Sequence, residues 1–261
     1  MCLILFSYQS DPRYRLLVAA NRDERYDRPA LPAAPWTDAP DIIAGRDLEQ
    51  GGTWMGYSRL GRFAAVTNYR EGSGRSVAPR SRGELVAGFL REDTAAGDYV
   101  RAIAASGSDY NGFSLLVEDG EELWFVSNRD AAPRRIEPGV HGLSNHLLDT
   151  PWPKVTTGID RLREAAALSA QDKIVGRLFD ALNGRTIPPD EGLPATGVGL
   201  ARERQLAPPF IVSEGYGTRA SSVLLVPHAG IAEFHERTFG PGGVLLAHAS
   251  HSIPSETATA G

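Results

Sequence analysis

The sequence contains one cysteine, Cys2, which directly follows Met1. Methionine aminopeptidases remove a first methionine when the next residue is small, as cysteine is. The thiol and a free α-amine would then sit on adjacent carbons. An α-amine titrates at about 7.7–8.0, which suits a general base, and a thiol is the side-chain nucleophile that is easiest to activate. One residue could therefore supply nucleophile and base, although it could also be a small buried hydrophobic residue at the start of a strand.

The charged run Asn-Arg-Asp-Glu begins at position 21, directly after the second apolar stretch of the chain. If the apolar stretches 2–8 and 15–20 pair as a hairpin, this run approaches the thiol. Asp23 could then accept a hydrogen bond from the α-amine and orient it, and Arg22 could lower the thiol pKa by favouring thiolate. The alternative is a solvated turn after a strand, where charged residues are common.

Three more polar residues stand at the ends of apolar segments. Asn68 closes a predicted hairpin, Asn145 precedes a Pro-bounded helix, and Arg219 precedes the last predicted hairpin. An asparagine amide at a strand end can donate a hydrogen bond to the oxyanion of an acyl-transfer reaction. It can equally cap a helix or satisfy a turn, so the position alone leaves both roles open.

The composition argues against several classes of protein. The chain has 27 Lys and Arg against 32 Asp and Glu, and this net charge of −5 disfavours nucleic acid as a partner. No apolar run is long enough to span a membrane, and the first residues do not resemble a secretory signal, so we expect a cytoplasmic protein. A single cysteine excludes intrachain disulfides. His248 and His251 have the spacing of a metal pair but no neighbouring ligand, and we expect no metal site.

The pattern of elements predicts an α+β fold with a largely antiparallel sheet. Alternating apolar residues predict hairpins, and a capping box and residues at helical spacing predict helices. The hairpins are expected at 2–20, 53–68, 112–127 and 221–236, and the helices after 81, at 155–166 and at 174–182. Residues 186–210 are expected to form a long loop. The pattern fits two stacked sheets between helices, or one sheet with helices on one side.

Several of these segments together resemble one family, and they occur in its expected order. They are Met1-Cys2, Ala20-Asn21-Arg22-Asp23-Glu24, Gly51-Gly52-Thr53-Trp54, Thr67-Asn68-Tyr69, Ser81-Arg82-Gly83-Glu84, Gly142-Leu143-Ser144-Asn145 and Tyr216-Gly217-Thr218-Arg219. Over roughly residues 1–240 the sequence resembles the NRDE family, also called the transport-and-Golgi-organisation-2 (TANGO2) family.

This resemblance implies an αββα sandwich of two antiparallel sheets flanked by helices. That fold is similar to the N-terminal-nucleophile (Ntn) hydrolases of the cholylglycine hydrolase and penicillin V acylase group, which cleave non-peptide amides with an N-terminal cysteine. We expect a single domain of this type over residues 1–250 and a flexible tail over 251–261.

The resemblance also implies roles for particular residues. Cys2 matches the nucleophile of the acylase group, and Asp23 matches the aspartate that binds its α-amine. Asn68 matches the oxyanion-hole asparagine, Asn145 a second asparagine near the amine, and Arg219 a late arginine near the thiol.

One position departs from the acylase pattern. The early acylase motif reads Gly-Arg-Asn-Leu-Asp, and aligning its Asn and Asp on Asn21 and Asp23 places Ala20 where the catalytic arginine belongs. Arg22 could substitute for that arginine if strand alternation turns it toward the thiol.

Two functions follow as expectations. The first is a Cys-nucleophile amidohydrolase or acyltransferase that acts on a small-molecule amide without a cofactor. The second is haem trafficking without catalysis, because members of the family have been proposed to move haem. The sequence has no haem-attachment motif, and it offers Cys2, His141 and His146 as possible axial ligands.

Overall fold

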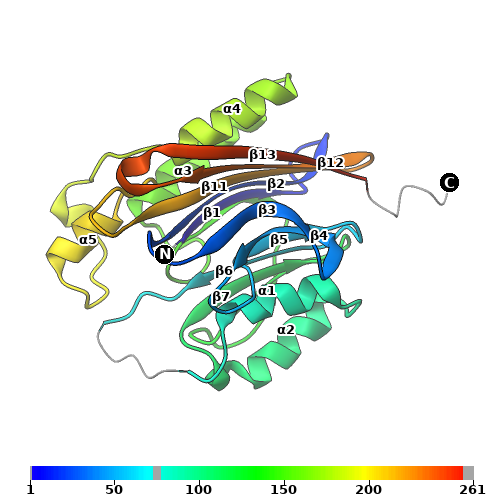
Figure 1. Cartoon of the computed structure of the whole chain (residues 1–261), viewed down its shortest axis with the longest axis horizontal. Coiled ribbons are helices and arrows are strands. Elements are labelled where there is room, and N and C mark those ends of the chain that lie inside the picture. The colour runs from blue at the N-terminus through cyan, green and yellow to red at the C-terminus, as the bar shows by residue number, and fades with distance from the viewer. Residues whose placement is uncertain (1, 73–77, 255–261) are drawn as a thin grey trace.

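Two antiparallel sheets face each other, and helices cover their outer faces (Figure 1). The structure is a computed structural model that describes residues 2–72 and 78–254. The first sheet has the strand order β10-β1-β2-β11-β12-β13, and the second has the order β3-β4-β5-β6-β7-β8-β9. The predicted αββα sandwich is therefore confirmed.

The first sheet contains β1 (Cys2–Tyr8), β2 (Tyr14–Arg25), β10 (Gly139–Leu143), β11 (Tyr216–Pro227), β12 (Ile231–Phe239) and β13 (Leu245–Pro254). The second contains β3 (Ala30–Trp36), β4 (Ala39–Asp47), β5 (Met55–Ser58), β6 (Phe63–Asn68), β7 (Phe113–Glu118), β8 (Leu123–Ser127) and β9 (Arg134–Arg135). The helices are α1 (Arg82–Arg91), α2 (Ala96–Ala105), α3 (Pro153–Ala166), α4 (Gln171–Leu182) and α5 (Leu200–Leu206).

Alternation along β1 shows how the sequence builds three apolar layers. Ile4 and Phe6 point into the core between the two sheets, whereas Leu3 and Leu5 point toward α3 and α4. A third apolar layer fills the space between the second sheet and helices α1 and α2. Burial of both faces explains why β1 reads as a continuous apolar run, since each face of a central strand packs against another layer.

Glycine allows α3 to approach β1 closely. A Cβ atom at Gly158 would lie 2.7 Å from the Leu5 side chain, which is too short for two carbon atoms. The helix therefore lies directly on the strand that begins with Cys2. Pro153 occupies the first turn of α3, where a missing backbone N–H removes no helical hydrogen bond.

The four predicted hairpins are present, and so are the helix after the capping box and the two helices that follow Pro151. The capping box itself is formed, with Ser81 and Glu84 each bonding the other's backbone. The strands at 30–36, 39–47, 134–135, 139–143 and 245–254 and the helix at 96–105 were not predicted, and α5 lies inside the expected loop 186–210. The charged run that begins at Asn21 is part of β2, which continues to Arg25, and is not a turn after a strand.

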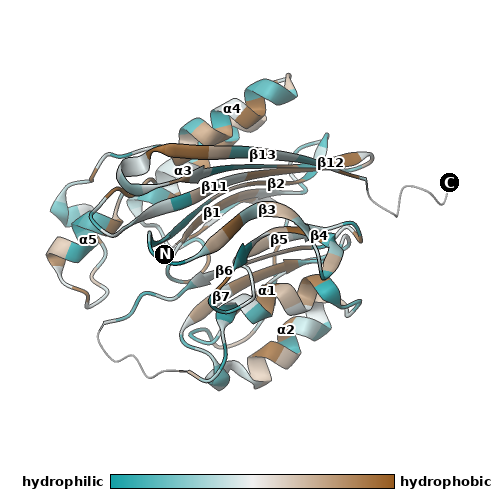
Figure 2. Cartoon of the chain, viewed as in Figure 1, coloured by the Kyte–Doolittle hydropathy of each residue, from teal (hydrophilic) through white to brown (hydrophobic). Residues whose placement is uncertain are grey.

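The last described strand corrects the expected boundary of the tail. Residues 251–254 belong to β13, which pairs with β12 as far as Pro254, and His251 Nε2 lies 2.8 Å from the carbonyl oxygen of Ala33 on β3. β13 is hydrophobic near its start and polar further along (Figure 2). Backbone pairing at the sheet edge thus outweighs its low strand propensity. The rest of the expected tail, 255–261, lies outside the described residues.

Among the described residues, no helix is both long and apolar enough to cross a membrane.

Candidate active site

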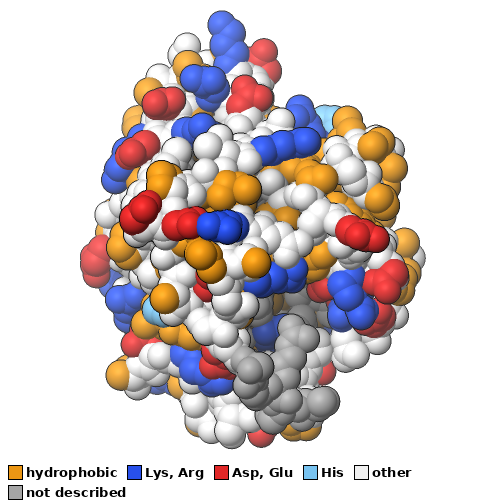
Figure 3. Space-filling view, turned by 90° about the vertical axis from the view of Figure 1, so that its left-hand side faces the viewer, with side chains coloured by type: hydrophobic (Ala, Val, Ile, Leu, Met, Phe, Trp, Pro, Cys, Tyr) orange, Lys and Arg blue, Asp and Glu red, His pale blue; other side chains and the backbone are white. Residues whose placement is uncertain are grey.

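A cavity of about 610 Å³ is lined by residues of both sheets and of the start of α1. Cys2, Arg22 and Arg219 line it from the first sheet, and Asn68 lines it from the second. The lining also includes Arg28, Arg46, Arg80 and Arg82. On the face turned toward the reader in Figure 3, Lys and Arg side chains border a hollow.

A row of paired residues on the first sheet lines this cavity. Cys2 pairs with Arg22, Arg22 with Ala220, Ala220 with Thr238, and Thr238 with Ala247. Side chains of directly paired residues in an antiparallel sheet point to the same face. The predicted hairpin therefore places Arg22 beside Cys2, on the same face as the thiol.

Charges and burial act in opposite directions on the thiol. Cys2 is buried, with 7% of its surface exposed, and this burial raises the thiol pKa. The negative charge of Asp23 raises it as well, whereas the charge of Arg22 and the backbone N–H of Asp23 lower it. The charged run of β2 therefore acts on the thiol in both directions, and Arg22 is its side chain that favours thiolate.

Asp23 is buried on the opposite face of β2, which is the face toward α3 and α4. The hydroxyl group of Thr218, on the neighbouring strand β11, donates a hydrogen bond of 2.6 Å to Asp23 Oδ1. The Tyr216 hydroxyl donates a hydrogen bond of 3.1 Å to the backbone oxygen of Asp23. Burial raises the pKa of Asp23, whereas the charges of Lys154 and Arg70 and the Thr218 hydrogen bond lower it.

Asn21 has a structural role. Its Nδ2 donates to the carbonyl oxygens of Leu182 and Pro209 at 2.9 and 2.8 Å. Its Oδ1 accepts a hydrogen bond from Ser221 at 2.6 Å. Asn21 thus ties β2 to the end of α4 and to the segment before β11.

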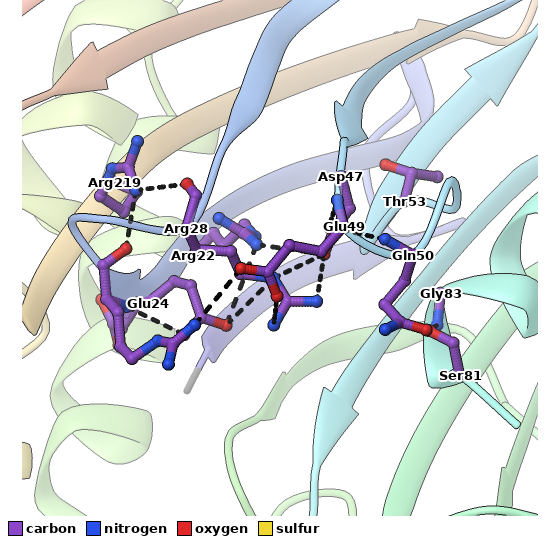
Figure 4. A network of polar contacts seen from close by, with 12 residues as sticks. Arg22, Glu24, Arg28, Asp47, Glu49, Gln50, Thr53, Ser81, Gly83 and Arg219 are labelled. Atoms are coloured by element: carbon purple, nitrogen blue, oxygen red, sulfur yellow. Dashed lines mark hydrogen bonds and ion pairs between the residues drawn. The ribbon is translucent and has the colours of Figure 1, made fainter. Parts of the chain in front are cut away.

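Arg22 belongs to a network of charged side chains that Figure 4 shows at the edge of the cavity. Its guanidinium lies 3.7 Å from Asp47 and 3.9 Å from Glu24, which is beyond hydrogen-bond distance. Arg28 takes the short contacts instead, at 2.8 Å to Asp47 and 3.1 Å to Glu49. Asp47 and Glu49 therefore bind Arg28 directly, whereas Asp47 and Glu24 act on Arg22 only through their charge.

Asn68 and Asn145 form a pair, but only Asn68 lines the cavity. Asn145 is fully buried, and its Nδ2 donates to Asn68 Oδ1 at 3.0 Å and to the Asn68 backbone oxygen at 3.2 Å. Because Asn68 Oδ1 accepts this bond, the Asn68 Nδ2 group points away from Asn145. Ser144, next to Asn145, donates to the backbone oxygen of Cys2 at 3.1 Å, which links this pair to the start of β1.

Arg219 stands at a bulge in β11 and binds the turn after β2. One guanidinium nitrogen donates to the backbone oxygens of Arg25, Tyr26 and Arg28 at 2.7, 3.1 and 3.1 Å. Figure 4 shows two of these bonds. Arg219 thus holds the turn that leads into β3, and Arg22 is the arginine paired with Cys2.

His141 and His146 do not line the cavity. His141 lies 2.8 Å from Asp149 and 3.1 Å from the backbone oxygen of Glu137, through different ring nitrogens. The ring nitrogens of His146 lie 2.6 Å from the Tyr69 hydroxyl and 2.9 Å from the Thr150 hydroxyl. Within residues 2–72 and 78–254, no cluster of His, Cys, Asp and Glu could hold a metal ion.

Sequence reasoning missed a group of buried charges behind Asp23. Lys154 and Arg70 are each 4% exposed and Glu203 is 3% exposed. Arg70 and Glu203 form an ion pair of 2.6 Å across 133 residues of sequence, which no local pattern reveals. Lys154 could have been noticed, because a lysine in the first turn of a predicted helix stands at the end where the helix dipole disfavours cations.

Comparisons with known proteins identify the family. The family model described as Transport and Golgi organisation 2 matches residues 1–241. The bovine Transport and Golgi organization protein 2 homolog is 38% identical over 259 residues, which cover 91% of this chain and 93% of the bovine protein. The Drosophila melanogaster Transport and Golgi organization protein 2 is 27% identical over 268 residues, which cover 91% and 92%.

A solved structure shows the same fold. Penicillin V acylase from Agrobacterium tumefaciens superposes with a TM-score of 0.51 at 11% identity, over 98% of this chain and 89% of the acylase. At that identity the likeness shows the fold alone, which is that of the Ntn hydrolases. The family match over residues 1–241 and the 38% identity to the bovine relative show that the chain belongs to the transport and Golgi organisation 2 family.

Proposed function

We propose that the chain, after removal of Met1, is a Cys-nucleophile amidohydrolase or acyltransferase that acts on a non-peptide amide. The observation that carries this proposal is the pairing of Cys2 with Arg22 at the cavity, with Asp23 buried on the next position of the same strand. A thiol, a cation that favours thiolate and a carboxylate that can hold an α-amine thus meet at the first residues of β1.

The reaction begins when the α-amine of Cys2 takes the thiol proton. The sulfur attacks the amide carbon, and the carbonyl oxygen becomes an oxyanion that accepts a hydrogen bond from Asn68 Nδ2. The α-ammonium then gives its proton to the amide nitrogen, and the carbon–nitrogen bond breaks. The products of this half-reaction are a free amine and a thioester on Cys2.

The thioester is removed in the second half-reaction. Water attacks the thioester carbon while the α-amine takes a proton from it, and the thiolate leaves and regains that proton. The product is a carboxylic acid. A second amine in place of water would receive the acyl group instead, which is the acyltransferase variant of the same chemistry.

Supporting residues hold the two reactive groups. Asp23 accepts a hydrogen bond from the α-amine, and Thr218 fixes the Asp23 carboxylate on its other side. Asn145 fixes the Asn68 amide so that its oxygen is occupied and its Nδ2 donor is free for the oxyanion. Arg22 favours the thiolate before the attack.

The test is an amide screen with the native sequence and two variants, Cys2→Ala and Cys2→Ser. The intact mass of the native protein is measured first, and we expect it to lack one methionine. Small acyl anilides then serve as probes, with release of the aniline as the signal. We expect release by the native chain and none by Cys2→Ala, and the proposal fails if Cys2→Ala releases aniline at the native rate.

Haem trafficking is the alternative function, and haem binding can be measured on the same proteins. Of the three expected ligands, Cys2 alone lines the cavity, so the structure favours hydrolysis. A haem carrier would bind haem equally well with Met1 retained, because binding to a thiolate does not require a free α-amine. An unprocessed chain that binds haem and shows no amide cleavage would therefore favour the alternative.

A further inference from the structure

The four edge strands of the two sheets differ in what lies along their outer sides. An edge strand presents a row of backbone N–H and C=O groups that another strand can pair with, so folded proteins protect their edges with prolines, charged side chains, covering loops or short strands. β10 and β13 form the edges of the first sheet, and β3 and β9 form the edges of the second. β3, β9 and β10 are each protected in one of these ways.

Two prolines and two side chains of the first sheet protect β3. Pro32 and Pro35 have no N–H group to offer to another strand. Between them, the N–H of Ala33 donates a hydrogen bond of 2.7 Å to Glu236 Oε1, and His251 Nε2 lies 2.8 Å from the Ala33 carbonyl oxygen. The backbone groups along this edge are thus partly removed and partly occupied.

A turn covers β10, and β9 is too short to offer a long edge. The N–H of Gly142 donates a hydrogen bond of 2.9 Å to Asp149 Oδ1, and the N–H of Asp149 donates one of 2.8 Å to the Gly142 carbonyl oxygen. β9 consists of two residues, and both are arginines. Short length and positive charge both discourage pairing with another chain.

In the part of the chain that the structure describes, β13 has none of these protections. It is ten residues long, contains no Lys, Arg, Asp or Glu, and has its only proline at its last residue. Its pairing with β12 is regular from Ala247 to Pro254, and Ile253 is its one buried residue. No strand of the described residues pairs with its outer side (Figure 1). β13 is therefore a long, uncharged edge that can accept a further strand.

An exposed apolar patch lies at the start of β13. Val244, Leu245 and Leu246 are 54% to 66% exposed, and Leu31 of β3 is 54% exposed. Leu31 and Leu246 also line the cavity, so the patch extends from the edge of β13 to the rim of the cavity. Exposed apolar side chains that lie together are typical of interaction sites.

We propose that a second copy of this chain pairs antiparallel with the outer edge of β13, around a twofold axis at Ser250, so that the two first sheets become one. In this register Ala247 faces Ile253 of the second copy, His248 faces Ser252, and Ser250 faces its own copy. Apolar residues thus meet apolar residues, and polar residues meet polar ones. A twofold axis sets each residue near it against its own kind, so a strand without charged residues suits self-pairing.

This pairing accounts for both unusual features of β13. It gives hydrogen-bond partners to the backbone groups on the outer side of the strand, which is how strands commonly join separate chains. It also brings the second copy beside the patch that contains Leu245 and Leu246, which removes apolar surface from water. Because Leu246 lines the cavity, the second copy would lie at its rim.

The experiment is sedimentation velocity of the full native chain at about 1–100 μM, a range that covers dimers of moderate affinity. Three variants with side chains of similar size are measured beside it. Ser250→Lys and Ser250→Glu place like charges opposite each other at the axis, and Ser250→Gln is the uncharged control. All three variants lose the Ser250 hydroxyl, which lies 2.9 Å from His235 Nδ1, so this contact does not distinguish them.

We expect the native chain and Ser250→Gln to form dimers. The dimer Kd of each charged variant should rise at least about tenfold, because like charges directly opposite each other destabilise a strand pair. An equal mixture of Ser250→Lys and Ser250→Glu should dimerise again, since opposite charges then meet. A native chain that stays monomeric at the highest concentration overturns the proposal, as do charged variants that dimerise like the native chain.

Hydrogen exchange of the native chain gives a second test that needs no variant. Amides of β13 should exchange more slowly at high than at low protein concentration, because the second copy occupies them. Slower exchange at another segment instead of β13 would assign the dimer to a different surface and overturn the proposal. Neither measurement uses a substrate, so this inference can fail while the proposed function holds, and the reverse.

Discussion

The hydroxyl group of Thr218 on β11 donates a hydrogen bond of 2.6 Å to Asp23 Oδ1 on the paired strand β2. The same hydroxyl oxygen accepts a hydrogen bond from the backbone N–H of Ile211 at 2.9 Å. Thr218 therefore orients the Asp23 carboxylate, which is proposed to hold the α-amine, and the Ile211 backbone in turn orients the Thr218 hydroxyl. This arrangement suits a buried group whose direction matters.

Replacement of this hydroxyl by a methyl group should weaken both the site and the fold. We expect Thr218→Val to lower the free energy of unfolding by about 1–3 kcal/mol, because a buried hydrogen bond to a carboxylate is lost at similar volume. Chemical denaturation measures this change. Thr218→Ser keeps the hydroxyl and serves as the matched control, and equal stability of Thr218→Val and the native chain would contradict the assignment.

The two asparagines should differ in their effect on catalysis. Loss of a direct oxyanion donor lowers kcat by about 10²–10³-fold, and we expect this of Asn68→Ala. Asn145→Ala should have a smaller effect, because it only releases the Asn68 amide from its fixed orientation. Steady-state kinetics on an anilide substrate give both values, and a larger effect at Asn145 than at Asn68 would reverse the assigned roles.

Arg22 should control the reactivity of the thiol. We expect Arg22→Met to raise the pKa of the Cys2 thiol, because the positive charge paired across from it is lost. The rate of alkylation by iodoacetamide, measured against pH, reports this pKa without a substrate. Arg22→Lys should retain most of the native reactivity. Identical pH profiles for the native chain and Arg22→Met would exclude an effect of Arg22 on the thiol.

A buried carboxyl group far from the site gives a prediction for stability against pH. Burial raises the pKa of Glu118 to about 7, from an ordinary value of 4.5, although Arg15 lies 3.0 Å away. The protonated form is thus favoured in the folded chain. The stability that this group contributes is fully present below pH 4.5 and is lost as the pH rises through about 7.

Glu118→Gln removes this titration while keeping the shape of the side chain. We expect the free energy of unfolding of Glu118→Gln, minus that of the native chain, to increase by about 1–3 kcal/mol from pH 4.5 to pH 7.5. Urea unfolding at several pH values measures the difference. A difference that does not change with pH, or that falls as the pH rises, would contradict a raised pKa at Glu118.

The hairpin of β1 and β2 could be predicted from sequence because both strands are long apolar runs separated by a turn. Its register places Cys2 beside Arg22, so the main features of the site follow from local pattern. Strand β3 could not be predicted in the same way. It contains Pro32 and Pro35, which normally argue against a strand, but it lies at the edge of its sheet, where proline is tolerated.

The supporting charges could not be found from sequence because they meet only in the folded chain. Arg70 and Glu203 come from distant segments, and Lys154 is buried on α3, which packs on β1. The role expected for Arg219 also depended on the fold. A bulge at Thr218 and Ala220 alters the register of β11 around Arg219, which binds the turn after β2.

The most direct test of the central claim compares two forms of the full chain that differ only in the residues before Cys2, so that its amine is free in one form and part of a peptide bond in the other. One is the native sequence with Met1 removed, as verified by its mass. The other carries one lysine inserted between Met1 and Cys2, which blocks methionine removal and leaves the thiol in place. We predict that only the processed form releases aniline from an acyl anilide and carries a transient acyl group on Cys2. Equal release by both forms would show that the free α-amine is not the base, and would contradict the proposed mechanism.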